Sequence, residues 1–313
     1  MFTAQNWPIA ANMLSFGSTA PDGTPMIEAP VAVWRSQLQQ VVDLDFEFVD
    51  PTDAWLSIGE LDDERFKEFQ SVLDEVGLRV PSVSTTRRSV VDAVDGERFL
   101  AIGHRIIDRA PELGATIVNF GFMQALRPAQ QEALWFWLAE GYQDPDDDSE
   151  LRTVALERIR ELGKHAAELG IEISLEMYED TFIGTADRAV RFVQDVDMSN
   201  VGLNPDLGNI ARLHRPIEDL PTMFDKVLPY TNFWHIKNYL RDEEPSTGQV
   251  FTAPVPLVMG VINYRAHILK ALELGYHGPF VCEHYGSDSL GVAAMNRDYI
   301  RQVLRSARLS TDA

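Results

Sequence analysis

Apolar residues recur every three or four positions in three long segments of the chain, with charged residues between them. This spacing puts the apolar side chains on one face of a helix, so each segment is predicted to be an amphipathic helix packed on a core. The apolar positions are Phe66, Phe69, Leu73 and Val76 in the first segment, Leu151, Val154, Ala155, Ile159, Leu162, Ala166 and Leu169 in the second, and Met295, Tyr299, Val303 and Ala307 in the third.

A Glu-x-Gly sequence occurs four times, each time before a short apolar run. Its glycines are Gly77, Gly114, Gly170 and Gly275. Glycine adopts the left-handed conformation that ends a helix without the steric penalty of a β-carbon. The repeat therefore predicts four helices that end at these glycines and lead into strands.

Eight short apolar runs alternate with the helical segments. Continuous apolar runs are typical of parallel strands that are buried on both faces. This alternation predicts a single (βα)8 TIM barrel formed by residues 1–313. A doubly wound open sheet is the alternative, but no Gly-x-Gly-x-x-Gly follows a strand, so a dinucleotide fold has little support. The predicted strands are 9–16, 42–49, 79–84, 115–120, 171–176, 201–206, 232–237 and 279–283.

Residues 123–149, after the fourth strand, are longer than a minimal barrel needs. They contain Trp135, Phe136 and Trp137, followed by an acidic run at 144–148. One interpretation is a surface helix and a solvated loop; the other is a lid or a partner-docking element, because clustered aromatic residues favour interfaces. A long polar loop, 241–248, follows the seventh strand. Both insertions favour a bulky substrate or a partner, and we expect a homo-oligomer or a complex with a small partner subunit.

Composition limits the classes of partner. The 313 residues include 27 Lys and Arg against 48 Asp and Glu, a formal charge of −21. A chain this acidic is expected to repel nucleic acids and anionic membranes. No apolar run reaches 18 residues, and the N-terminus lacks the features of a secretory signal. The single cysteine, Cys282, excludes an internal disulfide framework. We expect a cytoplasmic enzyme that binds a small molecule.

Four successive strands end in polar residues that could carry chemistry. They are Glu176, Asp206, His235 and Glu283. Active sites of (βα)8 barrels lie at the C-terminal ends of the strands, so these side chains are predicted to surround one mouth. Three carboxylates that close would repel one another without a cation, and with an imidazole they suit Mn²⁺, Co²⁺, Mg²⁺ or Zn²⁺. The alternative is that each acid caps the next helix or faces solvent.

These residues resemble the xylose-isomerase-like TIM-barrel superfamily, in its sugar isomerase/epimerase branch. The resemblance rests on Gly-Leu-Asn-Pro-Asp-Leu-Gly-Asn at 202–209, on Trp-His-Ile-Lys-Asn at 234–238 and on the order of the four polar residues. Ketose 3-epimerases and inosose dehydratases belong to this branch, and the large subunit of carbon-glycoside deglycosidases is a further candidate. The resemblance implies that a divalent metal is held by Glu176, Asp206, His235 and Glu283, and Mn²⁺ is the first candidate. It also implies that Glu176 and Glu283 exchange a substrate proton.

Four further residues are predicted to contact substrate, each with a structural alternative. Lys237 points to the same side as His235 and could bind a hydroxyl or form an ion pair. Asn209 stands where many epimerases have a histidine, so it can hydrogen-bond but not act as acid or base. Glu47 could reach the mouth or begin a helix in solvent. Trp55 could stack on a sugar or pack on the barrel rim.

Three functions remain open on the sequence. The first is a metal-dependent isomerase or epimerase that removes a proton next to the carbonyl of a keto-sugar, through an enediolate. The second is a lyase that eliminates from a 3-keto-glycoside at the same metal site. The third is a non-catalytic metal-bearing subunit. Endonuclease IV shares the fold, but it needs a histidine-rich three-zinc site and a basic face, and here only His235 closes a strand.

Overall fold

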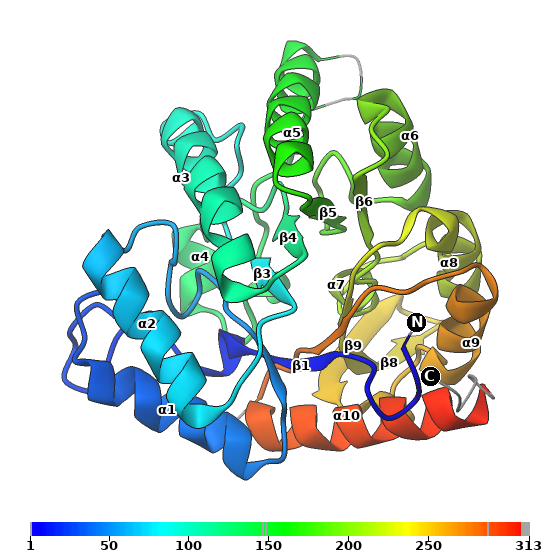
Figure 1. Cartoon of the computed structure of the whole chain (residues 1–313). Coiled ribbons are helices and arrows are strands. Elements are labelled where there is room, and N and C mark those ends of the chain that lie inside the picture. The colour runs from blue at the N-terminus through cyan, green and yellow to red at the C-terminus, as the bar shows by residue number, and fades with distance from the viewer. Residues whose placement is uncertain (1, 146, 148, 287, 308–313) are drawn as a thin grey trace.

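A ring of eight parallel strands forms the centre of the computed structural model, which describes residues 2–145, 147, 149–286 and 288–307 (Figure 1). The strands make two four-stranded sheets, in the orders β2-β1-β10-β7 and β3-β4-β5-β6. Parallel bridges from β2 to the β3 segment (Phe48 to Arg79, Thr52 to Ser84) and from β6 to the residues before β7 (Leu203 to Thr231) close the ring. The predicted TIM barrel is confirmed. Its strands are β1 (Ile9–Asn12), β2 (Phe48–Asp50), β3 (Ser82–Ser84), β4 (Ile117–Phe120), β5 (Glu172–Glu176), β6 (Val201–Asn204), β7 (Trp234–Ile236) and β10 (Phe280–Cys282).

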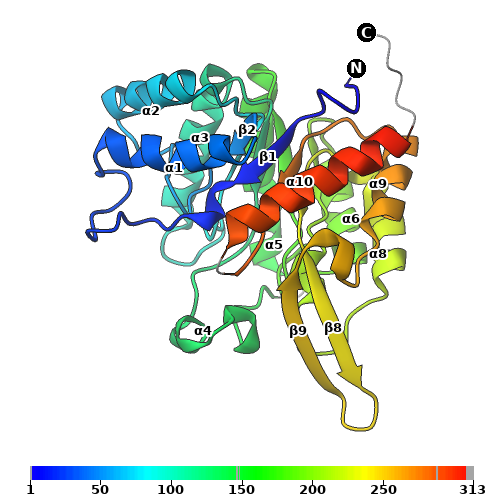
Figure 2. The same ribbon diagram turned by 90° about the horizontal axis from the view of Figure 1, so that it is seen from below.

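Helices surround this ring and bury their apolar faces against it (Figures 1 and 2). The three amphipathic segments predicted from the sequence form α2, α5 and α10, except that Leu169 and Ala307 directly follow the ends of α5 and α10 and Leu169 is exposed. Met295 is the exception to the predicted stripe in α10, because its side chain is exposed. The helices are α1 (Val31–Asp43), α2 (Asp63–Val76), α3 (Gly96–Arg109), α4 (Pro128–Glu132), α5 (Glu150–Glu168), α6 (Ala186–Val196), α7 (Gly208–Ala211), α8 (Leu220–Val227), α9 (Tyr264–Glu273) and α10 (Ser289–Ser306).

The four Glu-x-Gly glycines all have the backbone conformation that the sequence predicts. Gly77, Gly114, Gly170 and Gly275 have φ angles of 76°, 77°, 70° and 92°. No atom lies within 4 Å of where a β-carbon would stand at any of them. The requirement for glycine is therefore conformational, since there is room for a side chain.

Three segments differ most from the prediction. The strand expected at 9–16 ends at Asn12, and Met13–Ser15 form a short 3-10 helix. The run 42–49 was expected to be a strand, but Val42 belongs to α1 and β2 begins only at Phe48. The expected polar loop 241–248 is part of an antiparallel hairpin formed by β8 (Asn238–Glu244) and β9 (Gln249–Val255). Figure 2 shows this hairpin and α4 projecting from the same side of the barrel.

The insertion at 123–149 folds back over the barrel. Trp137 is buried and stacks on Trp135, with ring centroids 5.1 Å apart, and its other neighbours include Tyr239 and Tyr285. In the acidic run, Asp144 is buried and accepts the N–H of Phe182 at 2.9 Å. The run is thus more than a solvated loop, although Asp146 and Asp148 lie outside the described residues.

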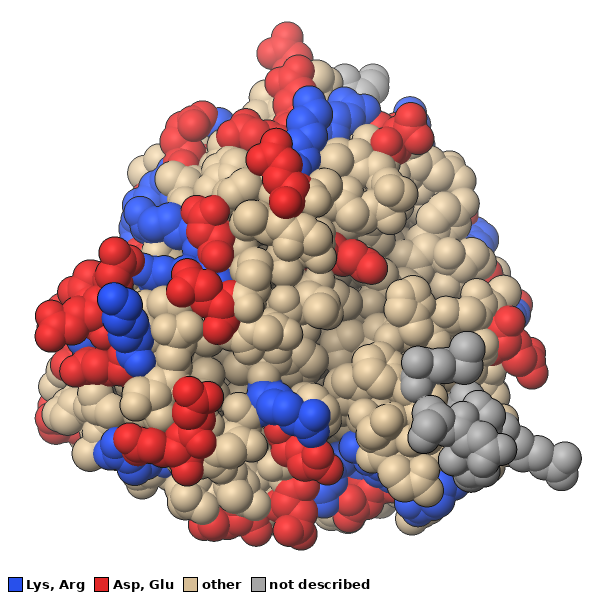
Figure 3. All heavy atoms as spheres, viewed as in Figure 1, with Lys and Arg blue, Asp and Glu red and all other residues tan. Residues whose placement is uncertain are grey.

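Acidic residues predominate around the rim of the face seen in Figure 3, and its centre is mostly uncharged. Among the helices that the structure describes, none is long and apolar enough to cross a membrane.

Replacing Gly170 with alanine tests the conformational requirement. The φ of 70° should make Gly170→Ala lower the free energy of unfolding by about 1–2 kcal/mol. Gly170→Asn should cost less, because asparagine tolerates the left-handed region better than alanine does. Urea midpoints for the two variants would show this order; equal midpoints would contradict it.

Asp144 should make stability depend on pH. Burial raises its pKa to about 7, against the hydrogen bond from Phe182 and the charge of Arg188. The folded state thus holds a proton that the unfolded chain releases near pH 4, so this stabilisation is present below pH 4 and is lost as pH rises through 7. Asp144→Asn keeps an oxygen for the Phe182 N–H but no longer titrates. The fall in melting temperature between pH 5 and 7 should be smaller in this variant than in the wild type.

Candidate metal centre

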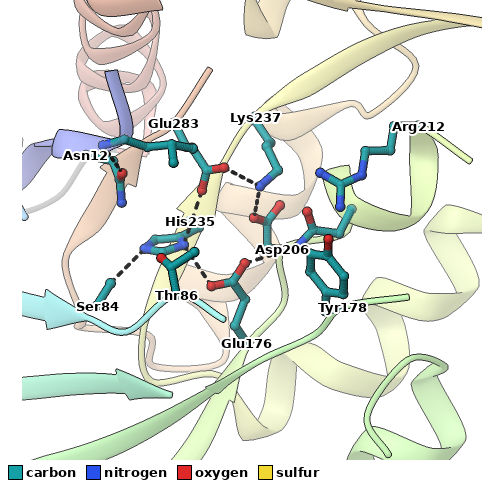
Figure 4. Close-up of polar contacts among 12 residues, drawn as sticks. Asn12, Ser84, Thr86, Glu176, Tyr178, Asp206, Arg212, His235, Lys237 and Glu283 are labelled. Atoms are coloured by element: carbon teal, nitrogen blue, oxygen red, sulfur yellow. Dashed lines mark hydrogen bonds and ion pairs between the residues drawn. The ribbon is translucent and has the colours of Figure 1, made fainter. Parts of the chain in front are cut away.

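Four polar side chains meet at the C-terminal ends of β5, β6, β7 and β10. Glu176 is the last residue of β5, Asp206 follows β6 by two residues, His235 is central in β7, and Glu283 directly follows β10. Each offers one ligand atom, and these atoms all lie within 4.8 Å of one another (Figure 4). All four residues are buried. The structure therefore brings together the set that the sequence predicts.

Two amides orient Glu176. Asn119 on β4 donates to Oε2 at 3.0 Å, and Asn209 on α7 donates to Oε1, also at 3.0 Å. Burial acts to raise the pKa of Glu176, but the charges of His235 and Lys237 and the Asn119 hydrogen bond outweigh it and lower that pKa to about 2. Glu176 is thus an ionised carboxylate in a fixed orientation.

Both ring nitrogens of His235 lie close to polar side chains. Its Nδ1 lies 3.3 Å from Glu176 Oε2 and 3.5 Å from Glu283 Oε2. Its Nε2 lies 3.1 Å from Ser84 Oγ and 3.7 Å from Asp50 Oδ2. A carboxylate or hydroxyl behind a histidine commonly fixes the ring of a metal ligand.

Asp50 is a site residue that the sequence prediction missed. It ends β2, and its carboxylate accepts hydrogen bonds from Asn12 at 2.9 Å and from Ser82 at 2.6 Å. The pattern of polar residues that close apolar strands would have found it, had the second strand been placed at 48–50.

Lys237 lies between two of the acids. Its Nζ is 2.5 Å from Asp206 Oδ2 and 2.7 Å from Glu283 Oε1. A β-carbon at Gly208 would stand 2.5 Å from Lys237 Cγ and 2.9 Å from the Lys237 carbonyl, so this close approach requires glycine. The ammonium neutralises one of the three negative charges at the centre.

Two observations fit a cation at this centre. Asp206 Oδ1 and His235 Nδ1 are buried and have no hydrogen-bond partner among the described residues. Burial raises the pKa of Asp206 to about 7, and the charges of Glu283 and Glu176 add to the rise against the charge of Lys237. Buried polar groups normally have partners, and a mixed carboxylate and imidazole set suits small divalent ions. These four residues could therefore hold a divalent metal.

The structure corrects two of the expected substrate contacts. Glu47 precedes β2, at the opposite end of the strand from the site; it is exposed and pairs with Arg79 at 2.6 Å. Trp55 is buried, packs on Phe69 of α2 and donates to Gln37 at 2.7 Å. Neither side chain faces the mouth, whereas Asn209 and Lys237 contact the four-residue centre directly.

The space in front of the centre has two parts. An inner chamber of about 30 Å³ is lined by Glu176, His235 and Glu283, among others. An outer cavity of about 190 Å³ is lined by the insertion, including Trp137, and by the segment after α7. A cavity needs about 10–15 Å³ of such volume to hold one water, so the inner chamber has room for about two or three water-sized groups, which is less than a whole sugar needs. Arg87, Met123 and Tyr178 line both spaces.

Comparison with known proteins shows the family. The model of the xylose isomerase-like TIM barrel family matches residues 38–308, so the chain belongs to this family. A xylose isomerase-like TIM barrel protein from Mycobacterium smegmatis, solved in complex with magnesium, is 59% identical, with a TM-score of 0.95 over 99% of this chain and 100% of that one.

More distant structures share the fold alone. A D-allulose 3-epimerase from Methylomonas sp. is 16% identical, with a TM-score of 0.66 over 95% of this chain and 98% of that chain. A 3-keto-D-glucoside 4-epimerase from E. coli is 14% identical, with a TM-score of 0.63 over 95% and 100%. The comparison with curated proteins gives no match.

Asp206→Asn and His235→Ala should both lower the metal content of the purified protein, because each removes a ligand from the centre. Inductively coupled plasma mass spectrometry of the dialysed protein measures the metal content directly. Glu47→Gln is a matched control, since it removes a carboxylate at the far end of a strand and should leave the metal content unchanged. Full metal occupancy in both site variants would contradict this assignment.

Proposed function

We propose that the protein is a divalent-metal-dependent sugar isomerase or epimerase, which exchanges a proton on the carbon next to the carbonyl of a keto-sugar. One observation carries the proposal. Two glutamates from different strands, Glu176 and Glu283, approach the same buried centre from two sides of His235, at 3.3 and 3.5 Å from its Nδ1 (Figure 4). A pair of carboxylates in this position can remove a proton on one face of a carbon and return one on the other.

The metal would be held by Glu176, Asp206, His235 and Glu283. When bound, it supplies Lewis-acid polarisation of the substrate carbonyl. The M. smegmatis protein was solved in complex with magnesium, which supports Mg²⁺, and the donor set equally suits the Mn²⁺ expected from the sequence.

The protein's own residues would divide the proton transfer between them. The amides of Asn119 and Asn209 orient Glu176. The charges of His235 and Lys237, with the Asn119 hydrogen bond, lower its pKa and keep it ionised, in the form that a base requires. Lys237 donates to Glu283 Oε1 and holds this second carboxylate in place. The buried surroundings exclude bulk water, which strengthens each of these electrostatic contacts.

A lyase acting on an oxidised glycoside is the second candidate, and the outer cavity favours it. The inner chamber has little room beyond the reacting atoms, and the larger space beside it would take a substituent such as an aglycone. Both reactions begin with removal of a proton next to a carbonyl. They differ in whether the proton returns or a group departs.

Glu176→Gln and Glu283→Gln should each lower kcat by about two to four orders of magnitude, because an amide oxygen can still face a metal but cannot take a proton. Metal content should fall less than in Asp206→Asn. Deuterium uptake from D₂O into a panel of keto-sugars measures the proton transfer, and EDTA should abolish it. Glu47→Gln again provides the control.

Analysis of the same reactions for released fragments separates the two candidates. Deuterium uptake without fragments indicates an epimerase or isomerase, whereas loss of an aglycone from a 3-keto-glycoside indicates the lyase. Wild-type exchange in Glu176→Gln would show that Glu176 is not the base.

A further inference from the structure

Arg87 lies where the inner chamber meets the outer cavity, and it lines both. It belongs to the loop between β3 and α3. Because the inner chamber is so small, a substrate whose reacting atoms reach Glu176 and Glu283 must extend past Arg87 into the outer cavity. Arg87 is therefore positioned to contact the part of the substrate beyond the reacting carbon.

The backbone of Arg87 is strained. Its φ is 55°, and the other non-glycine residues with positive φ in the described chain are all aspartates, Asp45, Asp180 and Asp197. Aspartate tolerates this region far better than a long side chain does. Strain of this kind persists where the surroundings enforce it, commonly at functional sites.

The guanidinium group is held in place by neutral partners. Nη1 donates to the Gln124 carbonyl at 3.0 Å and Nη2 to the Tyr178 hydroxyl at 3.3 Å. The group lies over the Phe136 ring, 4.8 Å from its centroid. Arginine has five N–H donors, so three are left for another partner, in a side chain that is already oriented.

Arg87 also has no carboxylate within ion-pair distance among the residues that the structure describes, unlike its neighbours. Arg88 pairs with Asp53 and Glu60, Arg212 with Glu179, and Arg215 with Asp180. Of the acids that line the outer cavity with Arg87, Glu179 and Asp180 are paired with other arginines and Glu140 is exposed. The positive charge of Arg87 therefore faces this cavity without a neighbouring carboxylate to neutralise it. A planar guanidinium with free donors binds carboxylate or phosphate oxygens well.

We propose that Arg87 is a specificity residue, and that the substrate is a keto-sugar carrying an anionic oxygen group, a carboxylate or a phosphate, which Arg87 binds at the junction of the two spaces. The proposal rests on the proposed function for the keto-sugar part. The anionic group is inferred from the geometry and charge around Arg87 alone.

Three sugars with one carbon skeleton provide the test: D-fructose, D-fructuronate and D-fructose 6-phosphate. Their affinities for the metal-loaded enzyme can be measured by calorimetry, and their proton exchange in D₂O by mass spectrometry. At least one anionic sugar should bind about 10- to 100-fold more tightly than fructose, as expected for hydrogen bonds to a charged group. Which of the two anionic sugars binds more tightly shows whether the site recognises a carboxylate or a phosphate.

Variants at adjacent positions separate recognition from structure. Arg87→Gln should remove the preference for the anionic sugar, and Arg87→Lys should keep part of it, because the charge remains without the planar fork. Arg88→Gln removes a neighbouring positive charge that Asp53 and Glu60 already neutralise. It should lower the melting temperature and keep the preference. Each variant retains the four metal ligands. Any affinity that comes from direct binding of an anion to the metal is therefore the same in all of them and does not affect the comparison.

The outcomes for the two proposals are distinct. If Arg87→Gln keeps the wild-type preference, or if neither anionic sugar binds more tightly than fructose, the assignment of Arg87 is overturned. If anionic sugars bind through Arg87 but no sugar exchanges a proton, the assignment stands and the proposed function fails. If a sugar exchanges a proton but no anionic sugar is preferred, the proposed function stands and the assignment of Arg87 fails.

Discussion

The mutual repulsion of three buried carboxylates is the constraint on which the rest of the site depends. Glu176, Asp206 and Glu283 converge where bulk water cannot solvate them. Lys237 offsets part of this charge through contacts at 2.5 and 2.7 Å. Because one ammonium faces three carboxylates, this compensation is partial; burial raises the pKa of Asp206, and the charges of Glu283 and Glu176 add to the rise. A divalent cation would complete it. The residues around the centre are arranged for such an ion: amides orient Glu176, and Ser84 and Asp50 lie behind His235.

The barrel makes this convergence possible. Each of the four groups comes from a different strand, and parallel strands deliver their C-terminal ends to one mouth. Left-handed glycines lead into two of these strands, Gly170 into β5 and Gly275 into β10. Two segments outside the ring of strands, α4 of the insertion at 123–149 and the β8–β9 hairpin, project from the same side of the barrel (Figure 2). The candidate metal centre and the outer cavity are thus formed by different parts of the molecule: the four-residue centre by the ends of strands, and the cavity walls mainly by loops.

Much of the fold and the centre could be predicted from the sequence, because the signals are local. A polar residue that closes an apolar run, repeated on successive strands, needs no knowledge of tertiary contacts, and this pattern located Glu176, Asp206, His235 and Glu283. Asp50 and Glu47 show how such a pattern fails. Val42 extends the apolar run but belongs to α1, so the predicted strand 42–49 began before β2 and included Glu47. It also stopped one residue short of Asp50, the last residue of β2.

Other features depend on contacts between distant segments. Trp55 is apolar and follows a strand, as a sugar-stacking residue would, but the packing of α2 decides that it is buried. The hairpin was hidden because most residues of 241–248 are polar or charged, as in a loop. Arg87 stands out because its φ is positive and because two cavities meet beside it. Neither feature can be recognised from the residues next to it in the sequence.

A titration of metal-stripped protein with Mn²⁺, followed by electron paramagnetic resonance, tests the metal centre most directly. Free aqueous Mn²⁺ gives a strong signal that is lost when the ion is bound in a rigid protein site. We predict that the free signal stays suppressed until about one equivalent per chain has been added, and that this suppression is lost when Asp206 is replaced by asparagine. A free signal that grows from the first addition to the wild-type protein would contradict a metal centre formed by these four residues.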